Sequence, residues 1–228
     1  MKYPGKELEI FDKAKIFQKY IYLITKKYFK NNILEVGAGI GSFTRSYLNN
    51  FSNIHLSELD QTNHSILKKK FFNKKNIKID DKTINEVNSN FNTIIYLNVL
   101  EHIKEDEKEI ELALSKLNPG GCLIILVPAH QNLFGKFDEA VGHYRRYDIS
   151  FFKSKNYENI KIKKLIHLDM VGYFLYFFNK MFFNEEIYPS KIKIFLWDKI
   201  FTPITIFIDF LTGYKFGKNI LCIYQKDG

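Results

Sequence analysis

Apolar and polar residues alternate along the chain with two different periods. Between residues 7 and 30, apolar side chains recur at helical spacing and predict one long helix, whereas the short apolar run Ile33–Val36 predicts a buried strand. The alternation continues with predicted strands at residues 53–57, 77–79, 93–97 and 122–127, and predicted helices at residues 42–48, 62–72 and 104–117. Strands that alternate with helices form a parallel sheet with right-handed crossovers. The pattern therefore predicts a doubly wound α/β fold.

The rhythm changes after Pro128. Residues 129–150 are polar and loop-like, residues 160–168 alternate like a strand, residues 170–212 are dense in aromatic and aliphatic side chains, and residues 218–226 predict a closing strand. We interpret residues 1–228 as one domain with four parts. These are an N-terminal helix (1–30), a ligand-binding core (31–128) that ends after the predicted turn 118–121, a lid or insert (129–215) and the closing strand (216–228).

Composition narrows the class of protein. With 46% hydrophobic and 26% charged residues, the chain resembles an ordinary globular protein. Its net charge of +9 comes from lysines scattered over the whole chain, which favours a solvated basic surface over a nucleic-acid site. Cys122 and Cys222 lie in apolar runs and predict neither disulfides nor zinc. No signal peptide or membrane-spanning run is evident, so the cytoplasm is the expected compartment.

A glycine-rich turn follows the first predicted strand. Gly37, Gly39 and Gly41 stand between this strand and the next predicted helix, where a tight turn lets a ligand approach the backbone. Glu58 follows the second strand and can accept hydrogen bonds from both hydroxyls of a ribose. One alternative is that the glycine-rich turn is a tight turn that binds no ligand. A second is that it binds a nicotinamide cofactor, but the nicotinamide-binding motif has glycine at the position of Ser42, which disfavours this alternative.

Several segments together resemble class I S-adenosylmethionine-dependent methyltransferases, in particular a bacterial branch that acts on small molecules. The segments are Ile33–Gly41, Asn98–His102, Leu117–Gly121, Val127–Ala129, Leu133–Gly135, Asp138 and Gly142–Tyr147. The resemblance covers residues 30–150 well and the rest loosely. It implies a Rossmann-like sheet of seven strands, mostly parallel, with the last strand antiparallel, followed by an aromatic helical elaboration.

The same resemblance implies that S-adenosylmethionine is the methyl donor and S-adenosylhomocysteine the product. The residues expected at the donor are Glu35, Gly37, Ala38, Gly39, Gly41, Glu58, Leu59, Asp80, Asp81, Asn98, Val99 and His102. Either Asp80 or Asp81 would lie near the adenine, and the sequence leaves both open.

Candidate residues for the acceptor cluster after the fifth strand. His143 is the candidate base and His102 a weaker one, with packing beside the cofactor as the alternative for His102. His143, Tyr144, Arg145, Arg146 and Tyr147 are expected to bind the acceptor, the arginines by pairing with an anionic group, although a purely structural network is the alternative. Glu101 and His102 alone do not predict a metal site, since no third ligand is adjacent.

We therefore expect methyl transfer to an oxygen, nitrogen or carbon of a small or lipid-linked acceptor. An NAD-dependent oxidoreductase and a non-catalytic, donor-binding partner protein are the alternatives. The aromatic segment 170–212 is compatible with a core, a homodimer face, a lipid-like acceptor or contact with the inner face of a membrane.

Overall fold

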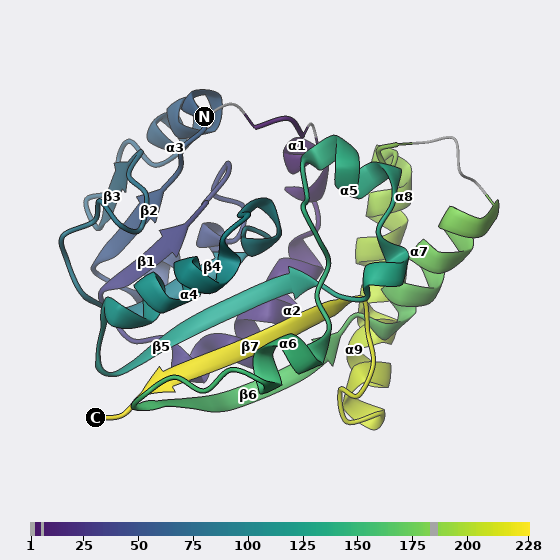
Figure 1. Cartoon of the computed structure of the whole chain (residues 1–228). Coiled ribbons are helices and arrows are strands. Elements are labelled where there is room, and N and C mark those ends of the chain that lie inside the picture. Colours follow the sequence, from purple (N-terminus) through teal and green to yellow (C-terminus); the bar gives the residue numbers. More distant parts are fainter. Residues whose placement is uncertain (1–2, 6, 183–186) are drawn as a thin grey trace.

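The computed structural model describes residues 3–5, 7–182 and 187–228. A single sheet runs through the centre of the molecule (Figure 1), with strand order β3-β2-β1-β4-β5-β7-β6. Its strands are β1 (Ile33–Val36), β2 (Ile54–Ser57), β3 (Ile77–Asp80), β4 (Phe91–Leu97), β5 (Leu117–Pro128), β6 (Ile160–Leu168) and β7 (Asn219–Lys226). Strand β7 is antiparallel to both neighbours, and the other paired strands of β1–β5 are parallel. The predicted fold class, including the antiparallel last strand, is confirmed.

Helices cover both faces of the sheet. They are α1 (Leu8–Phe11), α2 (Lys15–Thr25), α3 (Gln61–Lys70), α4 (Asp106–Ser115), α5 (Lys136–Val141), α6 (Ile149–Lys153), α7 (Met170–Phe182), α8 (Lys191–Leu196) and α9 (Thr202–Leu211). Short 3₁₀ turns are η1 (Lys26–Tyr28), η2 (Thr44–Ser46), η3 (Leu48–Asn50), η4 (Leu100–His102) and η5 (Gln131–Leu133), and a π-helical segment, η6 (Trp197–Phe201), joins α8 to α9.

The core divides into two layers because successive strand residues point to opposite faces. On one face, Leu34 and Ile125 pack with Ile110 of α4 and Phe152 of α6. On the other, the alternate strand residues pack with Ile21 of α2 and with residues of α3. Cys122 and Cys222 are both buried and belong to different layers, so the expectation of buried, unpaired thiols is confirmed.

The predicted helix over residues 7–30 is wrong in its continuity, because two helices replace it. The break lies at Asp12, whose carboxylate accepts hydrogen bonds from Arg45 (2.8 and 3.0 Å) and from Ser42 (2.5 Å). Helix α2 begins again where Asp198 accepts hydrogen bonds from the backbone N–H groups of Ile16 and Phe17, both at 3.0 Å. Because these partners are distant in sequence, helical periodicity alone could not locate the break.

The predicted helix over residues 42–48 is also wrong, and the turns η2 and η3 stand in its place. Thr44 and Tyr47 both donate to one carboxylate oxygen of Glu35, at 2.7 and 2.5 Å. In a 3₁₀ turn, side chains three residues apart lie one above the other, which brings both hydroxyls to the same acceptor. Two short 3₁₀ turns, and no α-helix, therefore follow the glycine turn over residues 42–50.

Two segments, one predicted as a turn (residues 118–121) and one as a polar loop (residues 129–150), contain regular secondary structure instead. Residues 118–121 belong to the irregular start of β5, where the register with β4 shifts between Phe91 and Thr93. Residues 129–150 contain η5, α5 and the start of α6, which carry the chain from β5 toward β6. The few apolar side chains of this segment, such as Leu133 and Val141, are nevertheless buried. The surrounding residues are polar, so the sequence pattern did not predict this burial.

Candidate functional site

The turn after β1 requires glycine at three positions. Gly37, Gly39 and Gly41 have φ values of 63°, 57° and 70°, in the left-handed region that other residues rarely adopt. A Cβ atom on Gly37 would lie 2.6 Å from Cγ2 of Val99, so the turn packs directly against the residues that follow β4. The ends of the two neighbouring strands β1 and β4 therefore form one continuous surface.

Glu58 joins the end of β2 to this turn. Its Oε2 accepts a hydrogen bond from the N–H of Gly39 at 2.7 Å, and its Oε1 accepts one from the N–H of Asp60 at 2.8 Å. The side chain is buried, and this burial raises the pKa of its carboxyl group. Glu58 therefore follows β2 directly and contacts the glycine turn, and its binding of a ribose stays a prediction.

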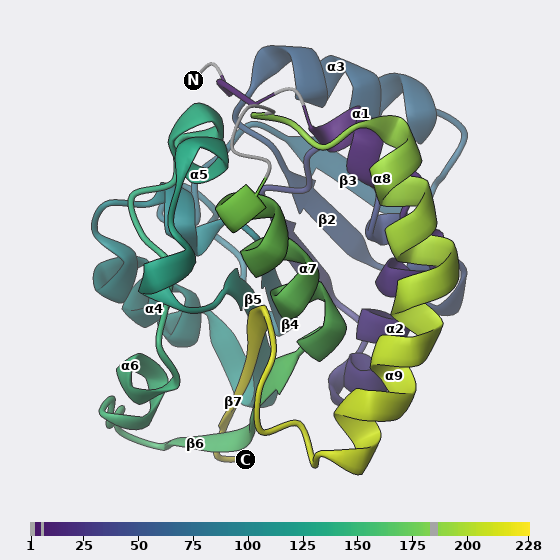
Figure 2. The ribbon, with the colours of Figure 1, turned by 90° about the vertical axis from the view of Figure 1, so that its right-hand side faces the viewer.

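The N-terminal segment lies over the same edge of the sheet (Figure 2). Asp60 caps α3 by accepting a hydrogen bond from the N–H of Asn63 at 2.9 Å, and its second oxygen accepts one from the N–H of Tyr3 at 2.8 Å. Leu8 of α1 lies 3.6 Å from the position of a Cβ on Gly39. Sequence analysis did not predict this cover, because Tyr3 reaches the edge through its backbone N–H and through an edge-on ring contact with His102, 57 or more residues away.

Glu35 lies beneath the turn, in the layer that α2 covers. Its carboxylate is buried and holds Thr44 and Tyr47, and desolvation raises its pKa to about 7. Its predicted role at the donor stays a prediction, as do those of Ala38 and Leu59, which follow β1 and β2.

The two acids that end β3 differ in their surroundings. Asp80 lies 2.7 Å from Nε2 of His55, a residue inside β2, so its carboxylate points back along the sheet. Asp81 is exposed and accepts a hydrogen bond from Gln61 of α3 at 3.1 Å. Of the two, Asp81 is therefore the one whose carboxylate remains at the edge.

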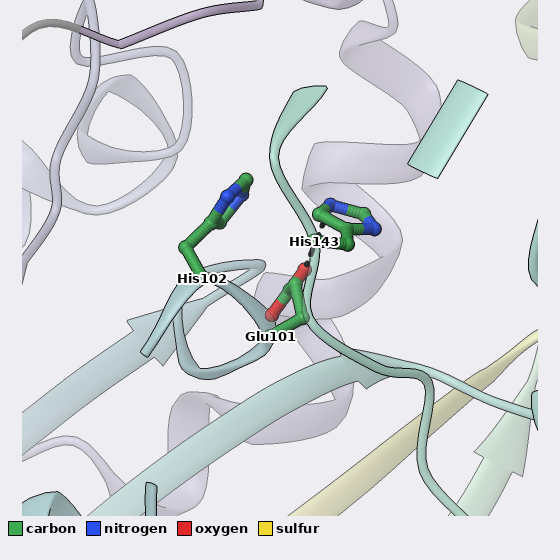
Figure 3. Close-up of side chains that lie close together, drawn as sticks. All are labelled: Glu101, His102 and His143. Atoms are coloured by element: carbon green, nitrogen blue, oxygen red, sulfur yellow. Dashed lines mark ion pairs between the residues drawn. The ribbon is translucent and has the colours of Figure 1, made fainter. Parts of the chain in front are cut away.

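The residues after β4 bring three ionisable groups together (Figure 3). Asn98 has a positive φ of 54° and its N–H is bonded to the carbonyl of Leu126, which turns the chain sharply into η4. This turn places Glu101 and His102 beside His143, whose ring lies 4.6 Å from that of His102. Burial raises the pKa of Glu101 to about 8, and burial, followed by the effect of His143, lowers the pKa of His102 to about 4.

A buried ion-pair network organises the segment that contains His143. Asp138 of α5 is fully buried and accepts hydrogen bonds from Nε and Nη2 of Arg146 at 2.8 and 3.0 Å. The same carboxylate lies 2.8 Å from Nδ1 of His143, and Tyr176 of α7 stacks on the Arg146 guanidinium at 4.5 Å. Network residues from α5, α7 and the intervening loop thereby fix the position of His143.

Hydrogen bonds to a buried acidic side chain also fix Arg145 and Tyr147 of the segment 142–147. Arg145 donates to one oxygen of Asp106 at 2.9 Å and Tyr147 to the other at 2.7 Å. Tyr144 is exposed, and its N–H is bonded to the carbonyl of Glu101. These contacts match the structural network that the sequence left as the alternative, and acceptor binding by Tyr144, the arginines and Tyr147 stays a prediction.

Sequence reasoning missed the partners in these networks. Asp106 belongs to a predicted amphipathic helix, where an acidic residue is expected to face solvent. Asp138 was included only as one residue of the segments that resemble the methyltransferases. Asp138 could have been predicted as an ion-pair partner, because it lies close in sequence to the pair Arg145-Arg146. Asp106 could not, because it lies 39 residues from Arg145 in sequence.

Comparison with known proteins agrees with this geometry. The family described as "Methyltransferase domain" matches residues 9–160. A search of curated protein sequences found no significant match.

Solved structures share the fold at low identity. An N-methyltransferase, NodS, from Bradyrhizobium japonicum WM9 in complex with S-adenosylhomocysteine has a TM-score of 0.60 and 12% identity, covering 95% of this chain and 88% of that one. An S-adenosylmethionine-dependent methyltransferase from Clostridium acetobutylicum has a TM-score of 0.60 and 15% identity, covering 96% and 97%. A complex of the Haloferax volcanii Trm112 activator with a methyltransferase includes a chain with a TM-score of 0.60 and 7% identity, covering 97% and 92%.

The family match spans the glycine turn, Glu58 and the turn after β4, which are the features that the sequence assigned to a methyl donor. The chain therefore belongs to the methyltransferase domain family, among the class I methyltransferases whose methyl donor is S-adenosylmethionine.

Proposed function

We propose that this protein transfers the methyl group of S-adenosylmethionine to a small or lipid-linked metabolite. The observation that carries the proposal is the meeting of three strand ends: the glycine turn after β1, Glu58 after β2 and η4 after β4. An NAD-dependent dehydrogenase would need glycine where Ser42 stands, and Ser42 instead donates to Asp12.

The residues present fit the donor. The Glu58 carboxylate lies at the strand edge with acceptor capacity for ribose hydroxyls, the glycine turn lets the methionyl end approach the backbone, and Asp81 is an exposed acid after β3 that suits the adenine. When bound, the donor supplies an activated methyl group on a sulfonium. The protein must then align the acceptor and exclude water, and the segment over the edge, with Tyr3 and α1, suits the second task.

Proton removal from the acceptor, where the reaction needs it, is a task for His143. Its Nδ1 is held by Asp138, so Nε2 is the nitrogen directed toward Glu101 and the donor side of η4. Because Asp138 fixes the orientation of the ring, the geometry suits His143 better than His102 as a base.

The nature of the acceptor is suggested by the helix that runs through α8, η6 and α9. Its buried stripe is largely polar and contains Asp198, Thr202, Thr205 and Asp209. Its exposed side is apolar, with Ile192, Phe195, Leu196, Ile200, Ile204, Phe207, Phe210 and Leu211 all open to solvent. A helix of a water-soluble protein normally has the opposite arrangement, with the apolar side inward.

The buried acids have partners that explain their position. Asp198 accepts from the first N–H groups of α2, and Asp209 accepts from the N–H groups of Asp169 and Met170 at the start of α7, at 2.8 and 3.1 Å. A carboxylate at a helix N-terminus compensates free N–H groups and the helix dipole. The inward polar side is therefore structural, and the outward apolar side needs a different explanation.

Contact with a lipid surface fits this outward side best. α7 lies beside α9 (Figure 2) and adds exposed Phe174 and Phe177, while Lys191 is exposed at the start of α8. Aromatic side chains flanked by lysines are typical of helices that lie on anionic membranes. Within the part of the chain that the structure describes, no helix is both long and apolar enough to cross a membrane. We infer that the acceptor is lipid-linked and is presented at a membrane surface.

Vesicle binding tests the lipid surface. The protein should sediment with vesicles containing phosphatidylglycerol, and a Phe207→Ser, Phe210→Ser double variant should lose at least about 10-fold in affinity, since each buried aromatic side chain contributes about 1.5–3 kcal/mol at full burial. Phe72→Ser is the matched control, because Phe72 is 86% exposed but follows α3, away from these helices. Equal binding by the double variant and the control would contradict the proposal, and a dimer lost in the double variant would assign the face to a second copy.

Calorimetry with Glu58 variants tests the donor site. Glu58→Ala should weaken S-adenosylmethionine binding about 100-fold or more, because two hydrogen bonds to a charged acceptor contribute about 1.5–3 kcal/mol each. Glu58→Gln, which keeps one acceptor for the glycine turn, should lose less. Glu109→Ala removes a carboxylate bonded to Tyr96 on the helical face and should bind normally. Unchanged affinity in Glu58→Ala would overturn the assignment.

A further inference from the structure

The three side chains of Figure 3 form a cluster of metal-ligating groups. Glu101 and His102 come from the turn η4, and His143 comes from the loop after α5. One ligand atom from each lies within 4.8 Å of the others, and Nε2 of His143 is 3.8 Å from Oε1 of Glu101. Ligand atoms around a tetrahedral zinc ion with bonds of 2.0–2.1 Å lie about 3.3 Å apart, so small side-chain rotations bring the three atoms to coordination distance.

The carboxylate of Glu101 lacks a partner. The side chain is fully buried, and neither Oε1 nor Oε2 has a hydrogen-bond partner among the described residues. A buried polar group without a hydrogen-bond partner is costly unless a proton or a bound cation compensates it. The charge of Arg146 acts on Glu101, but the guanidinium makes no hydrogen bond to it, since its Nε and Nη2 both bind Asp138. Both oxygens of Glu101 are therefore available to a ligand.

The orientation of His143 suits a metal ligand. Asp138 lies 2.8 Å from Nδ1, and the tautomer with its proton on Nδ1 is the one whose Nε2 has a lone pair for a metal ion. Two acceptors, Nε2 and the Glu101 carboxylate, then face each other at 3.8 Å, a separation too long for a hydrogen bond. A carboxylate that orients the far nitrogen of a histidine is the usual outer partner of a metal-bound imidazole.

The donor set specifies the class of ion. Two imidazole nitrogens and one carboxylate oxygen bind Zn²⁺ and related divalent transition metals, and leave at least one position open for a further oxygen ligand. The open position would face the edge shared with the glycine turn, because η4 follows Val99 and Val99 packs on Gly37.

We propose that Glu101, His102 and His143 bind a divalent transition metal ion, whose open position takes an oxygen of the acceptor. The second part rests on the proposed function and narrows it to an acceptor that presents a hydroxyl or a similar oxygen ligand. A bound ion lowers the pKa of such a hydroxyl and aligns it, so that His143 is a ligand and no longer a base. The sequence missed this site because the third ligand lies 41 residues after His102 in sequence and joins the pair only through the fold.

Direct metal titration tests the site without reference to activity. Full-length protein is stripped with a chelator, dialysed and titrated with Zn²⁺ in a calorimeter. One ion should bind per chain, and Glu101→Gln and His143→Ala should each weaken binding by more than about 100-fold, since loss of an outer partner alone typically costs 10–100-fold. Asp138→Asn should fall within that smaller range.

His130→Asn is the matched control. His130 lies between β5 and η5, outside the cluster, and its positive φ of 66° suits asparagine. His102→Ala serves as the second variant if the buried substitutions do not fold, because His102 is only half-buried.

The outcomes separate the two proposals. Loss of Zn²⁺ binding in the cluster variants, with normal binding in His130→Asn, supports the site. Absence of stoichiometric Zn²⁺ binding to the parent protein, or equal binding by His143→Ala and His130→Asn, overturns it. S-adenosylmethionine binding is measured separately on the same samples, so a parent protein that binds the donor but no Zn²⁺ would refute the metal site alone.

Discussion

The buried carboxylate of Glu35 makes a prediction about stability as a function of pH. Desolvation raises its pKa from an ordinary 4.5 to about 7, in spite of the hydrogen bonds from Tyr47 and Thr44. In the unfolded chain the group ionises near pH 4.5, whereas in the folded protein it keeps its proton to about pH 7. Between these values the folded state binds more protons, so the contribution of Glu35 to stability is complete below about pH 4.5 and is lost as the pH rises to about 7.

The size of the effect follows from the two pKa values. Each unit of pKa difference corresponds to about 1.4 kcal/mol, so the interval from 4.5 to about 7 corresponds to about 3 kcal/mol. Glutamine at this position stays neutral and keeps an oxygen for the two hydroxyl donors. Relative to the parent protein, Glu35→Gln should therefore gain about 3 kcal/mol in unfolding free energy between pH 4.5 and pH 8.

Urea denaturation at half-unit steps of pH measures this difference. Subtracting the parent curve from the Glu35→Gln curve removes the titration of all other groups, including the perturbed carboxyls of Glu58 and Glu101. The denaturation curves are measured without S-adenosylmethionine, so that ligand binding does not contribute to the free energy of unfolding. A difference between variant and parent that does not change with pH would refute the assigned pKa and the desolvation argument behind it.

Three further substitutions, the last with a neighbouring control, test local features by chemical denaturation. Gly37→Ala should destabilise the fold by at least about 1–2 kcal/mol, because a side chain at a φ of 63° is strained and its Cβ would lie 2.6 Å from a neighbouring methyl group. Asp138→Ala should cost about 3–5 kcal/mol, since it leaves the buried charge of Arg146 uncompensated; a smaller loss would show that the ion pair is solvated. Asp209→Ala should lower the free energy of unfolding by about 2 kcal/mol or more, because it removes a buried cap. The neighbouring Phe210 is 69% exposed, so Phe210→Ser should change the free energy of unfolding by less than about 0.5 kcal/mol. A larger effect from Phe210→Ser than from Asp209→Ala would contradict the arrangement with polar residues inward and apolar residues outward.

The strands of the central sheet were readable from the sequence because both of their faces are covered. The run from Cys122 to Val127 is continuously apolar, Ile33–Val36 is apolar except for the buried Glu35, and glycine or proline marks the turn beside each. The glycine turn and Glu58 were equally readable, since each follows directly from a strand end.

Features that depend on distant partners were not readable. The break before α2 is set by Asp198, which is 182 residues from Ile16, and no local pattern contains that information. The grouping of His143 with Glu101 arises only when the loop after α5 folds against η4.

The segment 170–212 illustrates the same limit. Its density of aromatic residues was visible, but which of them face outward was not, because the polar residues that normally mark the outer side of a helix here cap α2 and α7. Helical structure in this segment was implied by the resemblance, and only the tertiary structure shows that the helix through α8, η6 and α9 has its apolar side outward.

The most direct test of the account is calorimetric titration of the purified protein with S-adenosylmethionine, S-adenosylhomocysteine and NAD⁺ under identical conditions. We predict binding of the first two at a single site per chain and no binding of NAD⁺, since Glu58 and the glycine turn are assigned to the methyl donor. Binding of NAD⁺ without either adenosyl compound would contradict the central claim.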